Sequence, residues 1–319
     1  MELAKLPAKI FAGRSSKAFA EKICEYNGLV MGKSDTIQFS EGTLFVQIKE
    51  PVRGEDVYVV QTIGRSPNDE FMELQFHIDA LKRASANSVT AIMPYFAYAK
   101  GDKKDEPRVS IRARVCADNL ESVGVDRVIT MDLHSPQIQG FFKKPVDHFY
   151  AMQTLCDEVK KLGLDNLVVV SPDAGFTKDA RKYAKELGAG IAVGEKVRKD
   201  HNEQAEMMDM IGDVTGYNAL IVDDFTISCG TLAATAEFLV SKNAKRIFAC
   251  VSHCVMGEDA LKRLSESPIE LLLITDTVQN PEALMHPKIR MVSVAPMFSK
   301  AIHKIHNKES ISEMFDGQP

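Results

Sequence analysis

The chain lacks the sequence features that mark membrane-spanning, secreted and nucleic-acid-binding proteins. No stretch approaches the roughly 18 consecutive apolar residues of a membrane-spanning helix, and no basic segment followed by an apolar run marks a secretion signal. The formal net charge is −5, so no overall basic field attracts nucleic acid. We therefore expect a cytoplasmic protein that binds neither a membrane nor a nucleic acid.

Cysteine is sparse, and no two cysteines form a CxxC pair. In a chain of 319 residues, such scattered cysteines are typical of free thiols in a reducing compartment and do not indicate a disulfide framework. The six are Cys24, Cys116, Cys156, Cys229, Cys250 and Cys254.

What the chain does contain is the composition of a globular protein, with 45% hydrophobic and 26% charged residues. Short apolar runs predict strands at Val57–Gln61, Val89–Met93, Arg127–Met131, Leu167–Val170, Ala219–Val222, Arg246–Val251 and Leu271–Ile274. Amphipathic segments between them predict helices at Asn68–Ser85, Ile111–Val123, Met152–Leu162, Lys178–Leu187 and Thr231–Lys242. Strands that are apolar along nearly their whole length are typical of parallel sheets buried on both faces, so the pattern predicts an α/β fold.

This α/β pattern occurs twice, and the length suits two domains of ordinary size. We expect domains at 1–150 and 151–319, each a mainly parallel sheet flanked by helices. The tail, about 300–319, looks helical at first and is a candidate to return to the N-terminal domain. Two polar, charge-rich stretches, Lys100–Arg108 and Glu195–Met207, are interpreted as mobile loops.

The segment from Leu220 to Leu232 carries the clearest functional pattern. The strand Ala219–Val222 delivers two adjacent carboxylates, Asp223 and Asp224, and a Ser/Gly/Thr turn then leads into a helix. Backbone N–H groups and small hydroxyls in such a turn bind anions, and the helix dipole adds to the attraction. Since the acid pair can accept hydrogen bonds from a sugar diol, the segment favours a phosphorylated pentose. An ordinary strand–turn–helix with the acids as turn formers fits the segment, taken in isolation, equally well.

Two further strand ends carry residues able to bind a ligand. Asp132 and His134 follow one predicted strand, and Asp173 follows another. Ligands of open α/β sheets bind at the carboxyl ends of strands, and a histidine with carboxylates suits a divalent cation held together with phosphate oxygens. A lone histidine near a strand end is more often a structural hydrogen-bonding group, so this prediction depends on the three strand ends together.

The polar stretch Glu195–Met207 contains two cations at alternate positions, Lys196 and Arg198. In an extended segment they project to the same side, where they can neutralise charge on a transferring phosphoryl group. A solvated run of charges is the commoner outcome for such a stretch.

In this order, the motifs resemble the ribose-phosphate pyrophosphokinase (phosphoribosyl pyrophosphate synthase) family over essentially the whole chain. The most specific matches are Ile129–Phe142 and Val170–Gly175, with further ones at Ile78–Ser85 and Ile211–Val214. The resemblance implies two phosphoribosyltransferase-type domains and transfer of the β,γ-diphosphoryl group of ATP to O1 of ribose 5-phosphate, with Mg²⁺ as cofactor. It also implies a homo-oligomer in which dimers build up to a hexamer, and regulation by phosphate and ADP in the allosteric members.

The resemblance also assigns roles to individual residues. Lys196 and Arg198 correspond to the cations that stabilise the transferring group, and His134 and Asp173 correspond to metal ligands. The ribose 5-phosphate residues are Arg198, Asp223, Asp224, Ile227, Ser228, Cys229, Gly230 and Thr231. The ATP residues are Phe39, Glu41, Gly42, Thr43, Lys100, Gly101, Asp105 and His134, of which Lys100 to Asp105 lie on a loop contributed across a subunit interface. The regulatory positions are Arg53, Arg108, Ser310 and Ser312.

The chain departs from the family pattern at its ligand-binding segments. Ile227 stands where the phosphate loop usually has an aspartate, and losing such an acceptor costs roughly 1–3 kcal/mol if its partner stays buried. Thr43 replaces a glutamate in the adenine loop, and Lys100-Gly101 replaces an Arg-Gln pair. Because lysine lacks the planar fork of arginine, we expect altered nucleotide binding.

Three functions fit these observations. The retained cations, acids and histidine favour an active synthase. The departures at the ligand-binding segments motivate the alternative of a non-catalytic paralogue that associates with an active synthase and regulates it. A phosphoribosyltransferase that consumes the product shares the diol-and-phosphate loop, but it does not need the cations Lys196 and Arg198.

Overall fold

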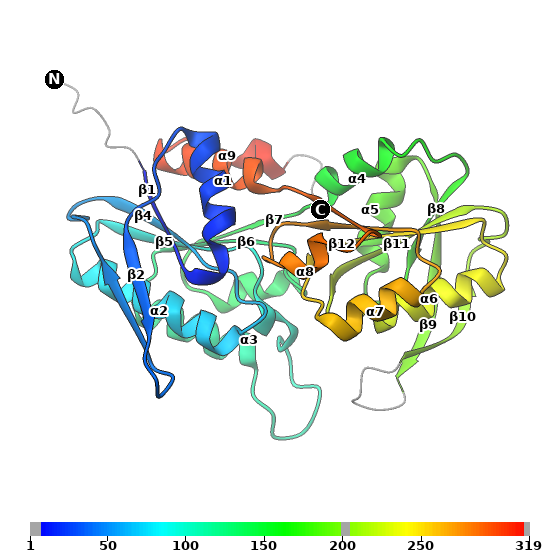
Figure 1. Ribbon diagram of the computed structural model, residues 1–319, viewed down its shortest axis with the longest axis horizontal. Helices are drawn as coiled ribbons and strands as arrows, with labels where there is room; N and C mark the ends of the chain where they lie inside the picture. The colour runs from blue at the N-terminus through cyan, green and yellow to red at the C-terminus, as the bar shows by residue number, and fades with distance from the viewer. Residues whose placement is uncertain (1–7, 199–204, 316–319) are drawn as a thin grey trace. The chain divides into compact units, whose positions relative to one another are not determined.

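The computed structural model describes residues 8–198 and 205–315, which form two compact units (Figure 1). Within the described residues, one unit falls inside Met1–Tyr150, Thr277–Gln279 and Val294–Gln318. The other falls inside Ala151–Asp276 and Asn280–Ser293. We call them the first and the second unit and describe each by itself.

The first unit is built on a five-stranded sheet in the order β1-β4-β5-β6-β7, with every neighbouring pair parallel. The strands are β1 (Lys9–Ala12), β4 (Asp56–Val60), β5 (Ser88–Met93), β6 (Arg127–Met131) and β7 (Val146–Phe149). A separate antiparallel hairpin consists of β2 (Ser34–Gln38) and β3 (Leu44–Ile48), and β3 packs against a helix, α2 (Pro67–Arg83).

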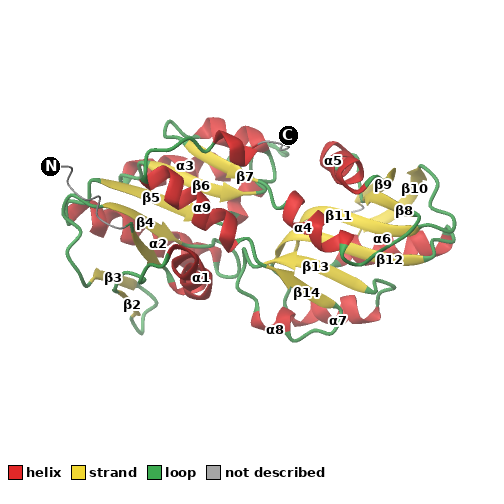
Figure 2. Ribbon diagram, turned by 90° about the horizontal axis from the view of Figure 1, so that it is seen from above, coloured by secondary structure: helices red, strands yellow, loops and turns green. Residues whose placement is uncertain are grey.

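Helices cover both faces of this sheet (Figure 2). The apolar sides of α2 and α3 (Arg112–Ser122) pack on one face, where Leu74, Ile78 and Leu120 are completely buried. On the other face, α1 (Lys17–Asn27) packs against α9 (Ala295–His306), and Phe19 meets Phe298 edge to face with ring centroids 5.4 Å apart. The chain segment after residue 293 therefore completes the core of the first unit.

The second unit contains a seven-stranded sheet in the order β10-β9-β8-β11-β12-β13-β14. Its strands are β8 (Leu167–Ser171), β9 (Gly190–Arg198), β10 (Ala205–Ile211), β11 (Asn218–Thr226), β12 (Arg246–Cys254), β13 (Leu271–Thr275) and β14 (Ile289–Val292). Only the pair β9 and β10, at one edge, is antiparallel. The helices are α4 (Met152–Lys160), α5 (Thr177–Leu187), α6 (Gly230–Ser241), α7 (Glu258–Glu266) and α8 (Pro281–Leu284).

The predicted α/β class is confirmed, and its physical basis is visible in the central strands. Ala219 to Val222 of β11 are all completely buried, because helices cover both faces of the sheet. No helix within residues 8–198 and 205–315 is long and apolar enough to cross a membrane.

The interpretation of Glu195–Met207 as a loop was wrong at both of its ends. β9 continues to Arg198 and β10 begins at Ala205, and the two pair with Met207 opposite Lys196. Residues 199–204 lie outside the described part of the chain. An edge hairpin is held by main-chain hydrogen bonds and needs no continuous apolar run, so its polar composition concealed it.

Candidate active-site segments

The carboxyl edge of the second sheet collects most of the residues predicted to bind ribose 5-phosphate. β8, β9 and β11 run parallel, so their carboxyl ends lie at the same edge. That edge carries Asp173 after β8 and the acid pair Asp223–Asp224 in β11. The backbone of Lys196 and Arg198 forms the last residues of β9, and the side chains of those two residues lie outside the described part of the structure.

The acid pair does not follow its strand, as the sequence had suggested, but lies within it. β11 continues through Thr226, four residues beyond the predicted end at Val222, because Phe225 and Thr226 still align with β12. Two main-chain amides bind the carboxylates: Asp224 N–H donates to Asp223 Oδ1 at 3.0 Å, and Phe225 N–H donates to Asp224 Oδ1 at 2.9 Å. Both side chains are therefore held by the strand itself.

Asp223 experiences an electrostatic environment that disfavours its charge. Burial, the negative charge of Asp224, a side-chain hydrogen bond with Asp224 and the charge of Asp173 together raise its pKa well above the ordinary aspartate value. The Asp223 carboxyl therefore binds a proton more readily than an ordinary aspartate, and a nearby cation or hydrogen-bond donor would relieve the repulsion. The edge is therefore prepared to bind hydroxyl groups or a divalent cation.

The turn between β11 and α6 has the geometry of an anion-binding turn. Cys229 adopts a left-handed conformation with φ 59°, directly before α6 begins at Gly230. Alternation of left- and right-handed backbone conformations turns successive N–H groups toward one side, and the N-terminus of α6 adds its dipole. Within the turn, Gly230 N–H donates to Ser228 Oγ over 3.4 Å.

An arginine that the sequence did not point to holds this turn from outside. Arg263 on α7 donates from Nη1 to the carbonyl oxygen of Ser228. The two residues are 35 positions apart, and no local pattern links them. The contact directs that carbonyl toward the guanidinium, which favours the exposure of the neighbouring amides to an anion.

The loop after β8 is organised by Asp173. Its Oδ1 accepts a hydrogen bond from Gly175 N–H at 2.8 Å, and its carbonyl oxygen accepts from Ser171 Oγ at 2.7 Å and from Thr177 Oγ1 at 3.3 Å. These contacts close a tight turn directly before α5. Asp173 is thus fixed at the same sheet edge as Asp223.

In the first unit, His134 lies on a turn held by the neighbouring strand β7. Asp132 adopts φ 39°, and its N–H donates to the carbonyl of Phe149 at 2.9 Å. Leu133 N–H donates to Nε2 of His148, a buried residue, at 2.8 Å. His134 itself is exposed. His148 therefore supports the predicted metal and ATP residue, a role with no signal in the local sequence.

The predicted adenine segment, Phe39 to Thr43, forms the tip of the β2–β3 hairpin. Gly42 N–H donates to Phe39 O and Phe39 N–H donates to Thr43 O, both at 2.9 Å. Thr43 Oγ1 donates to Glu41 Oε1 at 2.6 Å, and this bond is the main reason that the pKa of Glu41 lies below its usual range. The exposed ring of Phe39 lies 6.4 Å from that of Phe45.

The second predicted ATP segment follows β5. Lys100 ends a short 3-10 turn, and Gly101 N–H donates to the carbonyl of Tyr98 at 2.9 Å. A side chain added at Gly101 would overlap the side chain of Arg112. Glycine at this position thus accommodates a guanidinium that reaches in from α3. Asp105 belongs to the irregular, exposed stretch between them.

The four predicted regulatory residues also belong to the first unit. Arg53 Nη1 donates to Ser85 Oγ at 3.1 Å, and Arg108 adopts a left-handed conformation with φ 66°. Ser310 Oγ accepts from Ser312 N–H at 3.2 Å and donates to Ser312 Oγ at 3.0 Å.

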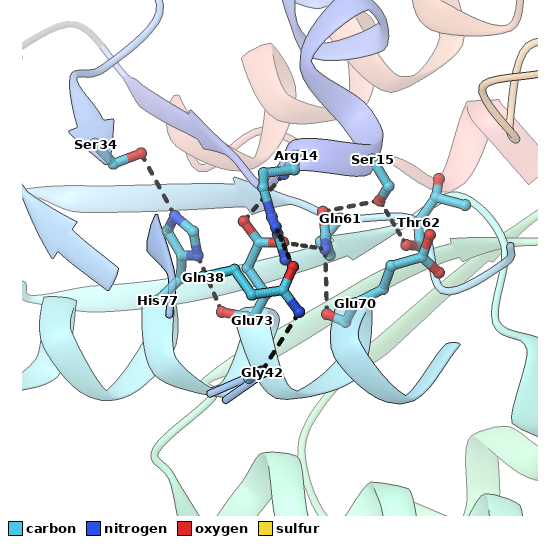
Figure 3. A network of polar contacts seen from close by, with 10 residues as sticks. All are labelled: Arg14, Ser15, Ser34, Gln38, Gly42, Gln61, Thr62, Glu70, Glu73 and His77. Carbon is cyan, nitrogen blue, oxygen red and sulfur yellow. Dashed lines mark hydrogen bonds and ion pairs between the residues drawn. The ribbon is translucent and has the colours of Figure 1, made fainter. Parts of the chain in front are cut away.

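Figure 3 shows a polar network that links the 3-10 turn after β1 (Arg14–Ser16), the segment after β4, α2 and the hairpin. The Glu73 carboxylate, whose side chain is 1% exposed, accepts from Arg14 N–H at 3.1 Å, from Arg14 Nε at 3.2 Å and from Gln61 Nε2 at 3.3 Å. His77, fully buried on α2, places Nδ1 3.0 Å from Glu73 O and Nε2 3.4 Å from Ser34 Oγ. The sequence assigned no functional role to any of these five residues.

Among the side chains that the structure describes, no group of three or more histidines, cysteines or acids is arranged to hold a metal ion by itself. The predicted ligands His134 and Asp173 belong to the first and the second unit respectively. Mg²⁺ usually takes only one or two protein carboxylates and completes its shell with water and substrate phosphates. The carboxylate cluster around Asp223 has the oxygen donors and excess negative charge that fit such an ion.

An anion-binding turn beside a pair of carboxylates, at the carboxyl edge of a parallel sheet, defines an α/β protein with a site suited to a phosphorylated ligand. Comparison with known proteins gives the particular family. Residues 8–124 match the N-terminal domain of ribose phosphate pyrophosphokinase, and residues 202–316 match the phosphoribosyl synthetase-associated domain.

Individual relatives match along nearly the whole chain. The ribose-phosphate pyrophosphokinase of Aquifex aeolicus is 44% identical over 308 residues, which cover 96% of this chain and 98% of the relative. That of Caldanaerobacter subterraneus subsp. tengcongensis is 44% identical over 309 residues, covering 96% and 97%. The crystal structure of phosphoribosylpyrophosphate synthetase from Mycobacterium smegmatis superposes with a TM-score of 0.89 at 33% identity, covering 95% of this chain and all of that one.

The chain therefore belongs to the ribose-phosphate pyrophosphokinase family, whose members are transferases. This confirms the resemblance inferred from the sequence motifs. It also confirms the predicted class of fold and enzyme, and none of these relatives favours the non-catalytic alternative.

Proposed function

We propose that this chain transfers the diphosphoryl group of ATP to O1 of ribose 5-phosphate and so forms 5-phosphoribosyl 1-pyrophosphate and AMP for nucleotide biosynthesis. The observation that carries the proposal is the β11–turn–α6 segment, where a carboxylate pair lies beside an anion-binding turn. Similarity to ribose-phosphate pyrophosphokinases over nearly the whole chain supports the same reaction.

In this reaction the O1 hydroxyl of the sugar loses its proton and attacks the β-phosphorus of ATP. The bond from that phosphorus to the oxygen bridging it to the α-phosphorus breaks, and AMP leaves. Because phosphoryl transfer forms a charged, loosely bonded transition state, the protein contributes mainly by positioning the reactants and neutralising charge.

We assign the residues of the second unit to ribose 5-phosphate. Asp223 and Asp224 accept hydrogen bonds from the ribose hydroxyls, and the turn from Ile227 to Thr231 binds the 5-phosphate through its amides. Lys196 and Arg198, at the end of β9, neutralise the transferring group. The raised pKa of Asp223 supports this assignment, since hydroxyl donors or a cation would relieve the repulsion among the acids.

We assign the nucleotide to residues of the first unit. The hairpin tip with Phe39, Glu41, Gly42 and Thr43 takes the adenine, and Lys100, Gly101, Asp105 and His134 take the rest of ATP, the Lys100–Asp105 loop coming from a neighbouring subunit. Mg²⁺ would supply further neutralisation of the phosphate charge, held by His134 and Asp173. The working molecule would be a dimer-based homo-oligomer, up to a hexamer, in the cytoplasm.

We further propose that phosphate and ADP regulate the enzyme through Arg53, Arg108, Ser310 and Ser312.

The functional domains would be 1–150 and 151–319, with the tail returning to the first. The stacking of Phe315 on Phe149, with ring centroids 5.2 Å apart, supports the return of the tail.

The test is a coupled AMP-release assay on the purified protein with ATP, ribose 5-phosphate and Mg²⁺. We expect AMP and 5-phosphoribosyl 1-pyrophosphate in equal amounts, and the same assay with other nucleoside triphosphates and with varied phosphate defines donor choice and regulation. No AMP from the homo-oligomer, together with increased turnover of a second synthase on mixing, would support the regulatory paralogue instead.

A further inference from the structure

The β2–β3 hairpin is connected to α2 at two points along β2. Ser34 and Gln38 are four residues apart, so they lie on the same face of the strand. On that face, His77 Nε2 of α2 lies 3.4 Å from Ser34 Oγ, at the base of the hairpin (Figure 3). Arg14 Nη1, which belongs to a guanidinium bound to Glu73 of α2, donates to Gln38 Oε1 over 3.4 Å near the tip. These two contacts therefore fix the position of the hairpin relative to α2.

Glu73 is the fixed end of this connection. Its carboxylate is 99% buried, because the side chain is 1% exposed, and three N–H donors bind it, two of them from Arg14. A buried carboxylate that loses its donors retains the cost of its desolvation, so Arg14 cannot leave without a penalty. The guanidinium is therefore held in place before it meets the hairpin.

The side chain of Gln38 connects Arg14 to the tip of the hairpin. Its Oε1 accepts from Arg14, so its Nε2 faces the opposite way and donates to the carbonyl oxygen of Gly42 over 3.4 Å. The reverse amide orientation would place an NH₂ group against the guanidinium and an oxygen against a carbonyl oxygen. Arg14 thus selects the orientation that holds Gly42, the residue that turns the tip with φ 94°.

We propose that the chain of contacts from Glu73 through Arg14 and Gln38 positions the hairpin tip for adenine-nucleotide binding, so that Arg14 and Gln38 are positioning residues that set the KM for ATP. This inference rests on the proposed function, which assigns the tip to the adenine. Neither side chain belongs to the groups assigned to the reacting atoms, so kcat stays unchanged. Both contacts with Gln38 are long and solvent-exposed, so each substitution raises the KM by about 3- to 10-fold.

The experiment compares Gln38→Ala, Gln38→Glu, Arg14→Ala and the double alanine variant in the AMP-release assay. Gln38→Glu keeps an acceptor for Arg14 but removes the donor to Gly42, so it separates the two contacts. Gln47→Ala is the matched control, because Gln47 is an exposed glutamine on the same hairpin. Thermal midpoints check folding, and the exposed Gln38 variants keep the test valid if Arg14→Ala unfolds.

We expect all Gln38 and Arg14 variants to raise the KM for ATP without changing kcat or the KM for ribose 5-phosphate. The double variant should be no worse than the poorer single one, since both remove one connection. Amide exchange at Gly42 should accelerate in the same variants. An unchanged KM for ATP in Gln38→Ala and Gln38→Glu, or an equal effect in Gln47→Ala, overturns the inference. Inactive wild-type protein that binds no ATP refutes the proposed function itself, a result visible before any variant is made.

Discussion

Asp223 is expected to reduce the stability of the protein while it serves the site. Its pKa is raised by burial and by the charges of Asp224 and Asp173. A raised pKa means that the folded state prefers the protonated acid, so the folded protein loses stability as the pH rises above the ordinary value of 3.8. Asp223→Asn removes the ionisation and keeps Oδ1, the acceptor of Asp224 N–H.

We expect Asp223→Asn to stabilise the ligand-free protein by about 1–2 kcal/mol at pH 8, the usual gain when a strained functional residue is relieved. For a domain of this size, each kcal/mol shifts the thermal midpoint by about 2–4 °C, so the midpoint should rise by about 2–8 °C. The gain should shrink as the pH is lowered toward the ordinary pKa of 3.8. Turnover should fall, because an amide at this position is both a poorer acceptor for ribose hydroxyls and uncharged.

The assay is thermal unfolding followed by circular dichroism between pH 4.5 and pH 8, and Asp213→Asn is its control. Asp213 is exposed, and hydrogen bonds from Thr215 lower its pKa, so its carboxylate stabilises the fold at neutral pH and that contribution is lost in acid. The control should therefore destabilise at pH 8. A midpoint for Asp223→Asn that falls at pH 8, or a gain independent of pH, would refute the reasoning.

Three further outcomes are expected. Lys196→Ala should lower kcat by about 10²–10³-fold with little change in either KM, and a raised KM at unchanged kcat would show a binding role instead. Phe298→Ala, which removes a fully buried ring in edge-to-face contact with Phe19 and Phe149, should cost about 3–5 kcal/mol in urea unfolding, and a loss under 1 kcal/mol would contradict that packing. Native protein at pH 8 should react slowly with a thiol reagent and show all six thiols only after denaturation, because burial raises the pKa of Cys24 to about 11 and that of Cys116, Cys156 and Cys229 to about 12. Rapid labelling of the native protein would show that these thiols are accessible.

The local sequence pattern was sufficient to predict an element whose faces are buried along its whole length. The apolar run of Ala219–Val222 predicted a central strand because both faces of the second sheet are covered by helices. It was insufficient for elements at the edges. The hairpins β2–β3 and β9–β10 are held by pairing between neighbouring strands, and the polar residues in their sequences resemble those of a loop.

By itself, the sequence determined the α/β fold and the family, and it supplied the residues of the proposed site: an acid pair with a following turn at Asp223–Thr231, and cations at Lys196 and Arg198. These follow from short stretches in which neighbouring residues act together. The tertiary structure alone decided which distant groups support them, as when His148 holds the His134 turn or Arg14 meets Glu73 across 59 residues. A periodic pattern encodes which face of an element is buried. It does not encode which side chains meet there, because that depends on the packing of elements far apart in the chain.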